Sequence, residues 1–146
     1  NLGAKEYDRT KKGALFGTIC GIGIAEVIGI AVFFFSPYLI AAFGGDQKAI
    51  EYGIAEAHTI ALFYCLLAFS HCMAAIQRGA GRSIVPMFVM MIVWCGVRVT
   101  YISIVIRIIP VINVIYWAYP LTWFISSVIF LILFLKTDWI HGLEKQ

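Results

Sequence analysis

The sequence predicts an all-α, polytopic membrane protein in which one membrane domain, residues 1–146, holds four transmembrane helices. Of its residues, 62% are hydrophobic and 13% are charged, whereas a soluble domain is roughly half apolar and about a quarter charged. The apolar residues also gather in four long stretches, and about 20 helical residues suffice to cross the hydrocarbon core of a bilayer. The stretches cover about residues 13–37, 57–78, 84–109 and 114–135.

The connectors between these stretches carry most of the charge. We expect residues 43–53 (FGGDQKAIEYG) and a turn near Asn113 on one side of the membrane, and the Arg78–Arg82 loop on the other. Eight basic residues fall on the side of the Arg78–Arg82 loop and two on the opposite side. Because cytoplasmic connectors carry the excess of lysine and arginine, this predicts a cell-membrane protein with both ends of the segment in the cytoplasm. The eight are Lys5, Arg9, Lys11, Lys12, Arg78, Arg82, Lys136 and Lys145, and the two are Lys48 and Arg107.

The segment AIQRGAGRSIVP, residues 75–86, places a G-x-G pair between two arginines. Such glycines hold phosphate groups when they follow a β-strand and open a soluble helix, but here apolar spans lie on both sides. We interpret the segment as a tight hairpin in which Gly79 and Gly81 permit positive φ and Ser83 caps the next helix. The hairpin residues are Arg78, Gly79, Gly81 and Arg82, with both arginines at the lipid headgroups.

Three ionisable residues lie at similar depth in the predicted spans, namely Glu26, His71 and Arg98. Such groups are expensive inside a bilayer, so each is a candidate for transport or ion coupling. Glu26 could exchange a proton for an organic cation, form an ion pair with Arg98, or be a solvated acid in an open lumen. His71 fits a packed, hydrogen-bonded side chain better than a proton carrier.

Small residues recur at every fourth position of the first span, a spacing that lets another helix approach closely. The four cysteines form no C-x-x-C pair and lie in apolar stretches, so we interpret them as packing residues. No nucleophile–base set or metal-ligand spacing is found, which predicts neither an enzyme nor a cofactor or metal site. The small net charge of +3, with dispersed basic residues, predicts no nucleic-acid binding. The small residues are Gly13, Gly17, Gly21, Ala25 and Gly29.

Five motifs, in this order and at this spacing, resemble the multidrug and toxic compound extrusion (MATE) family of antiporters. NLGAKEYDRTKKG at the start resembles the cytoplasmic loop before the ninth helix of that family, and FGGDQKAIEYG resembles the following outer loop. QRGAGRSIVPM (77–87) resembles the R-G-A-G-D-T-x-x-P-M turn between the tenth and eleventh helices. WCGVRV (94–99) resembles a W-x-x-R-x-P stretch, and YPLTWFISS (119–127) resembles the start of the last helix.

The resemblance implies that this chain is the last four helices of a six-helix C-terminal lobe in a twelve-helix antiporter. A start at Asn1 rather than Met fits such a fragment. The implied activity is export of organic cations, drugs or metabolites in exchange for protons or sodium. The implied partners are the bilayer, the missing helices of the same transporter and a small organic cation.

The sequence departs from the family pattern at three places. Arg82 stands where the turn has Asp, Thr100 stands where the tryptophan–arginine motif has Pro, and no acid lies between Ala57 and Arg78, where some branches carry part of a cation site. The resemblance therefore assigns no coupling residue, and the absent N-terminal lobe is an alternative place for the ion site.

Three other functions are alternatives to this one. A complete small multidrug resistance transporter, acting as a dimer, also has four helices and an acid in the first, although little precedes its first span. A flippase for lipid-linked precursors would offer several basic residues at mid-depth, where Arg98 is the only arginine. A membrane subunit without transport activity would have little use for Glu26, His71 and Arg98 inside its spans.

Overall fold

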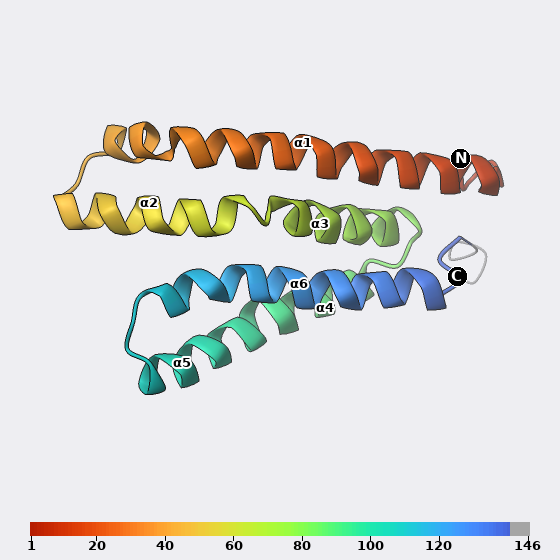
Figure 1. Cartoon of the computed structure of the whole chain (residues 1–146). Helices are drawn as coiled ribbons and strands as arrows, with labels where there is room; N and C mark the ends of the chain where they lie inside the picture. Colours follow the sequence, from red (N-terminus) through yellow and green to blue (C-terminus); the bar gives the residue numbers. More distant parts are fainter. Residues whose placement is uncertain (141–146) are drawn as a thin grey trace.

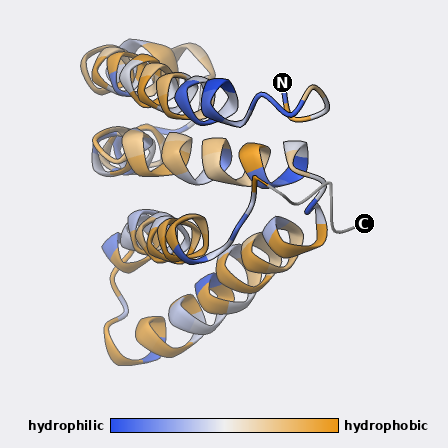
Figure 2. Ribbon diagram, turned by 90° about the vertical axis from the view of Figure 1, so that its right-hand side faces the viewer, coloured by the Kyte–Doolittle hydropathy of each residue, from blue (hydrophilic) through white to orange (hydrophobic). Residues whose placement is uncertain are grey.

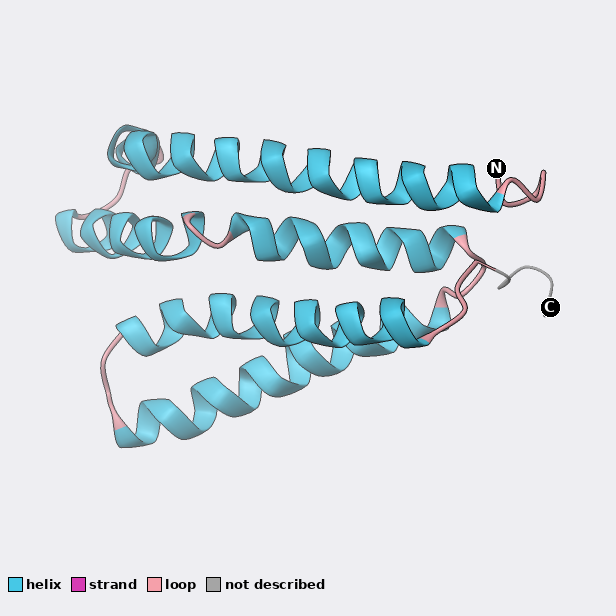
Figure 3. Ribbon diagram, turned by 45° about the vertical axis from the view of Figure 1, so that its right-hand side comes forward, coloured by secondary structure: helices cyan, strands magenta, loops and turns pink. Residues whose placement is uncertain are grey.

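The computed structural model describes residues 1–140, and every regular element in that range is a helix (Figure 3). Lys145, counted above among the basic residues, lies outside the described range. The elements are α1 (Tyr7–Ala42), α2 (Gln47–Ala61), α3 (Tyr64–Gly79), α4 (Ile84–Met90), the π-helix η1 (Met91–Val97), α5 (Arg98–Ile108) and α6 (Asn113–Lys136).

The helices pack side by side in successive layers (Figure 1). Helix α1 packs on α2 and α3, α3 packs on α6, and α6 packs on the segment formed by α4, η1 and α5. The N-terminus, the α3–α4 connector and the end of α6 lie at one end, and the α1–α2 and α5–α6 connectors lie at the other. Helix α6 is central in the bundle. In its most apolar 18-residue stretch 39% of the residues are buried, compared with 11% in the corresponding stretch of α1.

Three helical segments are long and apolar enough to cross a membrane, namely α1, Ile84–Ile108 and α6. The second predicted span consists of two helices, α2 and α3, which meet at a 59° bend and count as a fourth span when taken together. The prediction of an all-α membrane protein is therefore confirmed. The second span is broken at residues 62–63 rather than continuous.

The first helix extends well beyond the apolar stretch at 13–37 that predicted it. A proline removes a backbone donor and is expected to end a helix, yet α1 continues through Pro37 to Ala42. The Ser36 hydroxyl donates a hydrogen bond to the Phe33 carbonyl at 3.2 Å. That carbonyl is the one that the missing N–H of Pro37 would have served, so the side chain takes over part of the backbone's role.

The second helical segment also begins earlier than predicted. Asp46 accepts a hydrogen bond from the Ala49 N–H at 2.8 Å, and this cap starts α2 at Gln47. The connector after α1 is therefore residues 43–46, where residues 43–53 were predicted. Apolar composition marks the part of a helix inside the hydrocarbon core, whereas the cap decides where the helix begins.

The buried core is small, and many large apolar side chains are exposed on the outside of the bundle. The ribbon is hydrophobic along most of each helix (Figure 2). Met73 and Ala74 of α3 pack against Phe130 of α6. On the outer surface, Phe16 is 71% exposed and Leu135 is 74% exposed. Such continuous apolar surface is unfavourable in water and matches the acyl chains of a bilayer.

Candidate functional site

Glu26 lies on the face of α1 that packs against α3, and it is half-buried. Its Oε2 atom is buried and has no hydrogen-bond partner among the described residues. The Cys65 thiol, in the first turn of α3, lies within hydrogen-bonding reach of the carboxylate. Because buried polar atoms are nearly always satisfied, an unpartnered carboxylate oxygen marks a place that can hold a proton or a cation.

The break in the second span lies close to this carboxylate. Gly29, about one turn after Glu26, packs directly on the Ala61 carbonyl group and on the Tyr64 ring. Beyond Ala61 the regular α-helical hydrogen bonding is interrupted, and the Phe63 carbonyl accepts from the Leu66 N–H at 3.0 Å. In secondary transporters, broken helices of this kind supply backbone carbonyl groups as ligands for coupling ions.

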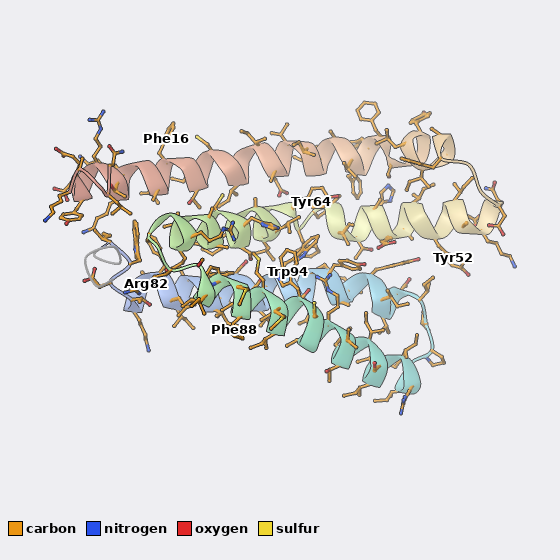
Figure 4. The ribbon with its side chains drawn as sticks, turned by 180° about the vertical axis from the view of Figure 1, so that it is seen from behind. Phe16, Tyr52, Tyr64, Arg82, Phe88 and Trp94 are labelled. Carbon is orange, nitrogen blue, oxygen red and sulfur yellow. The ribbon has the colours of Figure 1, made fainter. Side chains whose placement is uncertain are left out.

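Arg98 lies at the centre of a second cluster, which bridges η1, α3 and α6. Its Nε and Nη2 atoms donate hydrogen bonds to Thr122 Oγ1, at 3.3 Å and 2.7 Å. Its guanidinium carbon lies 4.3 Å from the centroid of the Tyr119 ring and 5.6 Å from that of the Trp94 ring. Trp94 in turn contacts His71 edge to face, with the ring centroids 5.2 Å apart, and reaches from η1 toward α3 (Figure 4).

The two charged groups do not form the ion pair that the sequence left open. Glu26 belongs to α1, which packs on α2 and α3, whereas Arg98 belongs to α5, which packs on α6, so the two residues lie on helices that do not pack on each other. Thr122 and two aromatic rings surround the Arg98 guanidinium. His71 is exposed and held against Trp94, in contrast to the packed, hydrogen-bonded histidine expected from the sequence.

The small residues of α1 contact a neighbour over only part of their stripe. A methyl group added at Gly29 would overlap the Ala61 carbonyl oxygen, and one added at Gly21 would lie 2.9 Å from Cys72 Sγ. At Gly13 and Gly17 an added methyl would meet nothing within 4 Å. These two line an open groove with Ala14, Thr18, Cys72, Ala75 and Ile76.

The glycine-rich hairpin is a helix C-cap of the Schellman type. The Arg82 N–H donates to the Gln77 carbonyl at 2.9 Å, and the Gly81 N–H donates to the Arg78 carbonyl at 3.0 Å. Gly81 has a φ of 80°, as this cap requires, whereas Gly79 stays helical as the last residue of α3. The predicted side-chain cap is wrong, because Ser83 forms no such hydrogen bond. Its backbone is already helical, which is not the usual geometry of a capping residue.

Sequence reasoning missed a cluster of hydroxyl groups between α3 and α6. Ser70 lies 2.9 Å from both Ser126 and Ser127, oxygen to oxygen, and Ser127 donates to the Leu66 carbonyl at 3.1 Å. Serines in apolar spans often form hydrogen bonds between helices, so the adjacent serines of the last span were the available signal. Among residues 1–140, no group of three or more His, Cys, Asp or Glu side chains could hold a metal ion.

Together, the long apolar helices and the broken span define a helical membrane protein as the class of protein. The MatE family profile matches residues 1–102, well over half of the chain. The chain therefore belongs to the multidrug and toxic compound extrusion (MatE) family, whose members are transporters and not enzymes. Comparison with curated proteins and with solved structures found no significant match.

Proposed function

We propose that the chain forms part of a secondary antiporter that exports organic cations, drugs or metabolites in exchange for protons or sodium, with Glu26 as the coupling acid. The observation that carries this proposal is the buried Glu26 Oε2 atom, unpartnered among the described residues, beside the broken second span. A carboxylate there can hold a proton, a sodium ion or a cationic substrate, but only one at a time. Competition for one group is the simplest way to couple inward ion flow to outward substrate flow.

The arrangement of the helix ends supports a cytoplasmic position for both ends of the segment. The N-terminus, the α3–α4 hairpin and the end of α6 share one end of the bundle (Figure 1), and the sequence places most of its basic residues there. We propose the cell membrane as the location. The proposed partners are the bilayer, further helices of the same transporter and a small organic cation. Only 11% of the most apolar 18-residue stretch of α1 is buried, which leaves this helix open to lipid and to further helices.

The test of this function is a change at Glu26 in the natural gene product, expressed in cells that lack other efflux pumps. Glu26→Gln keeps the shape of the side chain and removes the exchangeable proton. We expect efflux of a fluorescent organic cation to fall and its dependence on pH or sodium to disappear. Glu51→Gln is the matched control, because Glu51 is exposed near the start of α2. Unchanged efflux and ion dependence in Glu26→Gln would reject the coupling role.

A further inference from the structure

We propose that the Arg98 cluster binds the carboxylate group of an amphipathic substrate. The proposal rests on the transport function proposed above, because its ligand is a molecule that the transporter carries. It adds a substrate class to that function, since cation export by itself has no use for a cationic site in the middle of a span. Arg98, Trp94, Tyr119, Thr122 and His71 make up the site.

The positive charge of Arg98 is not neutralised within the described part of the chain. A guanidinium group has five N–H donors and stays charged at all physiological pH values. The oxygen that accepts from Arg98 is the single hydroxyl of Thr122, and the other close groups are the rings of Tyr119 and Trp94. A charge near the middle of a span is costly and normally pairs with an opposite charge, so these neutral contacts leave Arg98 short of an anionic acceptor.

The neighbouring side chains add donors rather than acceptors. Trp94 Nε1 is buried and has no hydrogen-bond partner among the described residues, and an indole N–H can only donate. The hydroxyl of Thr122 donates its own proton to the backbone, where the Ala118 carbonyl lies at 2.9 Å and the Tyr119 carbonyl at 3.0 Å. A cluster with surplus donors and a positive charge repels a cation and attracts a carboxylate.

The shape of the cluster favours a carboxylate on an aromatic or otherwise apolar body. A guanidinium group and a carboxylate are both planar and can form two parallel hydrogen bonds. The rings of Trp94 and Tyr119 lie beside the guanidinium and offer apolar walls. Arg98 is only half-buried and His71 is exposed, so the cluster is open on one side.

The local backbone at this cluster is unusual. Residues Met91–Val97 form a π-helix, and Arg98 follows directly as the first residue of α5. Segments of π-helix are rare and occur frequently at functional sites. In this chain Trp94 of the π-helix contacts α3, and Arg98, which follows the π-helix, contacts α6. The π-helix therefore lies where the third span meets two other helices.

The experiment compares two dyes that differ in one group, a xanthene dye with a free carboxylate and its methyl ester. Their binding to the purified natural protein in lipid nanodiscs is measured by fluorescence polarisation, without any ion gradient. We expect the acid to bind at least about tenfold more tightly than the ester, a difference of ~1.4 kcal/mol. Arg98→Gln should abolish this preference, so that the acid binds no more tightly than the ester, and Arg98→Lys should retain only part of it.

Arg107→Gln is the matched control, because Arg107 is an exposed arginine in the last turn of the same helix, and it should keep the full preference. Equal or absent binding of the two dyes by the unmodified protein would overturn the proposal, and this comparison needs no variant to fold. That result is also expected if a carboxylate from another helix of the transporter already neutralises Arg98. A preference that survives Arg98→Gln would equally overturn it.

The experiments distinguish failure of the carboxylate site at Arg98 from failure of the antiport function at Glu26. If Glu26→Gln loses ion-coupled efflux while the dyes bind equally, the carboxylate site is wrong and the antiport function stands. If the acid is preferred through Arg98 but efflux never depends on Glu26 or on an ion gradient, the binding site stands and the proposed coupling is wrong.

Discussion

The close approach of Gly29 to the backbone of α2 predicts a sharp difference between two glycines of α1. Gly29 of α1 is buried, and a methyl group added there would overlap the carbonyl oxygen of Ala61. Because that oxygen belongs to the backbone of α2, it cannot rotate away, and the two helices would have to separate. Gly17 lies on the same stripe of α1, but an added methyl there would meet nothing within 4 Å.

The magnitude follows from the difference between Gly29→Ala and Gly17→Ala. Both variants gain the same helix propensity, up to about 1 kcal/mol, so this term cancels between them. Overpacking destabilises a protein by about 1–3 kcal/mol, and a clash with backbone belongs in the upper part of that range. We therefore expect Gly29→Ala to be less stable than Gly17→Ala by ~2 kcal/mol. Gly21→Ala should fall between them, because the sulfur of Cys72 at 2.9 Å can rotate aside.

Thermal unfolding of the purified protein in detergent measures this difference. For a domain of this size ~2 kcal/mol corresponds to a lower unfolding temperature by about 4–8 °C. If Gly29→Ala unfolded at the same temperature as Gly17→Ala, the close contact between α1 and the break in the second span would be refuted.

Two further predictions concern the serine cluster and the hairpin. Ser70→Ala removes two hydroxyl contacts of 2.9 Å between α3 and α6 and should lower stability by ~1 kcal/mol, at about 0.6 kcal/mol for each hydrogen bond in a membrane protein. The exposed Ser103→Ala should have no effect in the same unfolding assay, and equal stability of the two variants would contradict the cluster's role. Gly81→Ala should destabilise by ~1–2 kcal/mol because Gly81 has a φ of 80°. Gly79→Ala, at a helical position with nothing within 4 Å, should be neutral or stabilising by up to about 1 kcal/mol, and the Schellman cap would be wrong if both variants behaved alike.

The sequence predicted the spans well because the bilayer demands long apolar stretches, but it did not predict the break in the second span. The break lies at Leu62 and Phe63, where no glycine or proline marks an interruption. In the folded chain the glycine at the point of contact is Gly29, which lies on another helix and packs against Ala61 just before the break. A feature that depends on packing between helices leaves little trace in its own segment.

The candidate site was predicted in part. Position along the predicted spans placed Glu26 and Arg98 near mid-span, and both lie within the helical segments that were expected. Depth does not say in which layer a helix packs, so the Glu26–Arg98 pair remained open until the order of the helices was known. The π-helix before Arg98 was not predicted either, because Met91–Val97 contains no residue pattern that separates it from an ordinary apolar helix.

We propose that this chain belongs to an ion-coupled exporter in which Glu26 is the coupling group. The decisive measurement reconstitutes the natural protein and its Glu26→Gln variant in liposomes and imposes a proton or sodium gradient. We expect the gradient to drive movement of a fluorescent cation by the unmodified protein, an ionophore to abolish this movement, and Glu26→Gln to show no response to the gradient. Movement at the same rate with and without the gradient, or an undiminished response in Glu26→Gln, would contradict it.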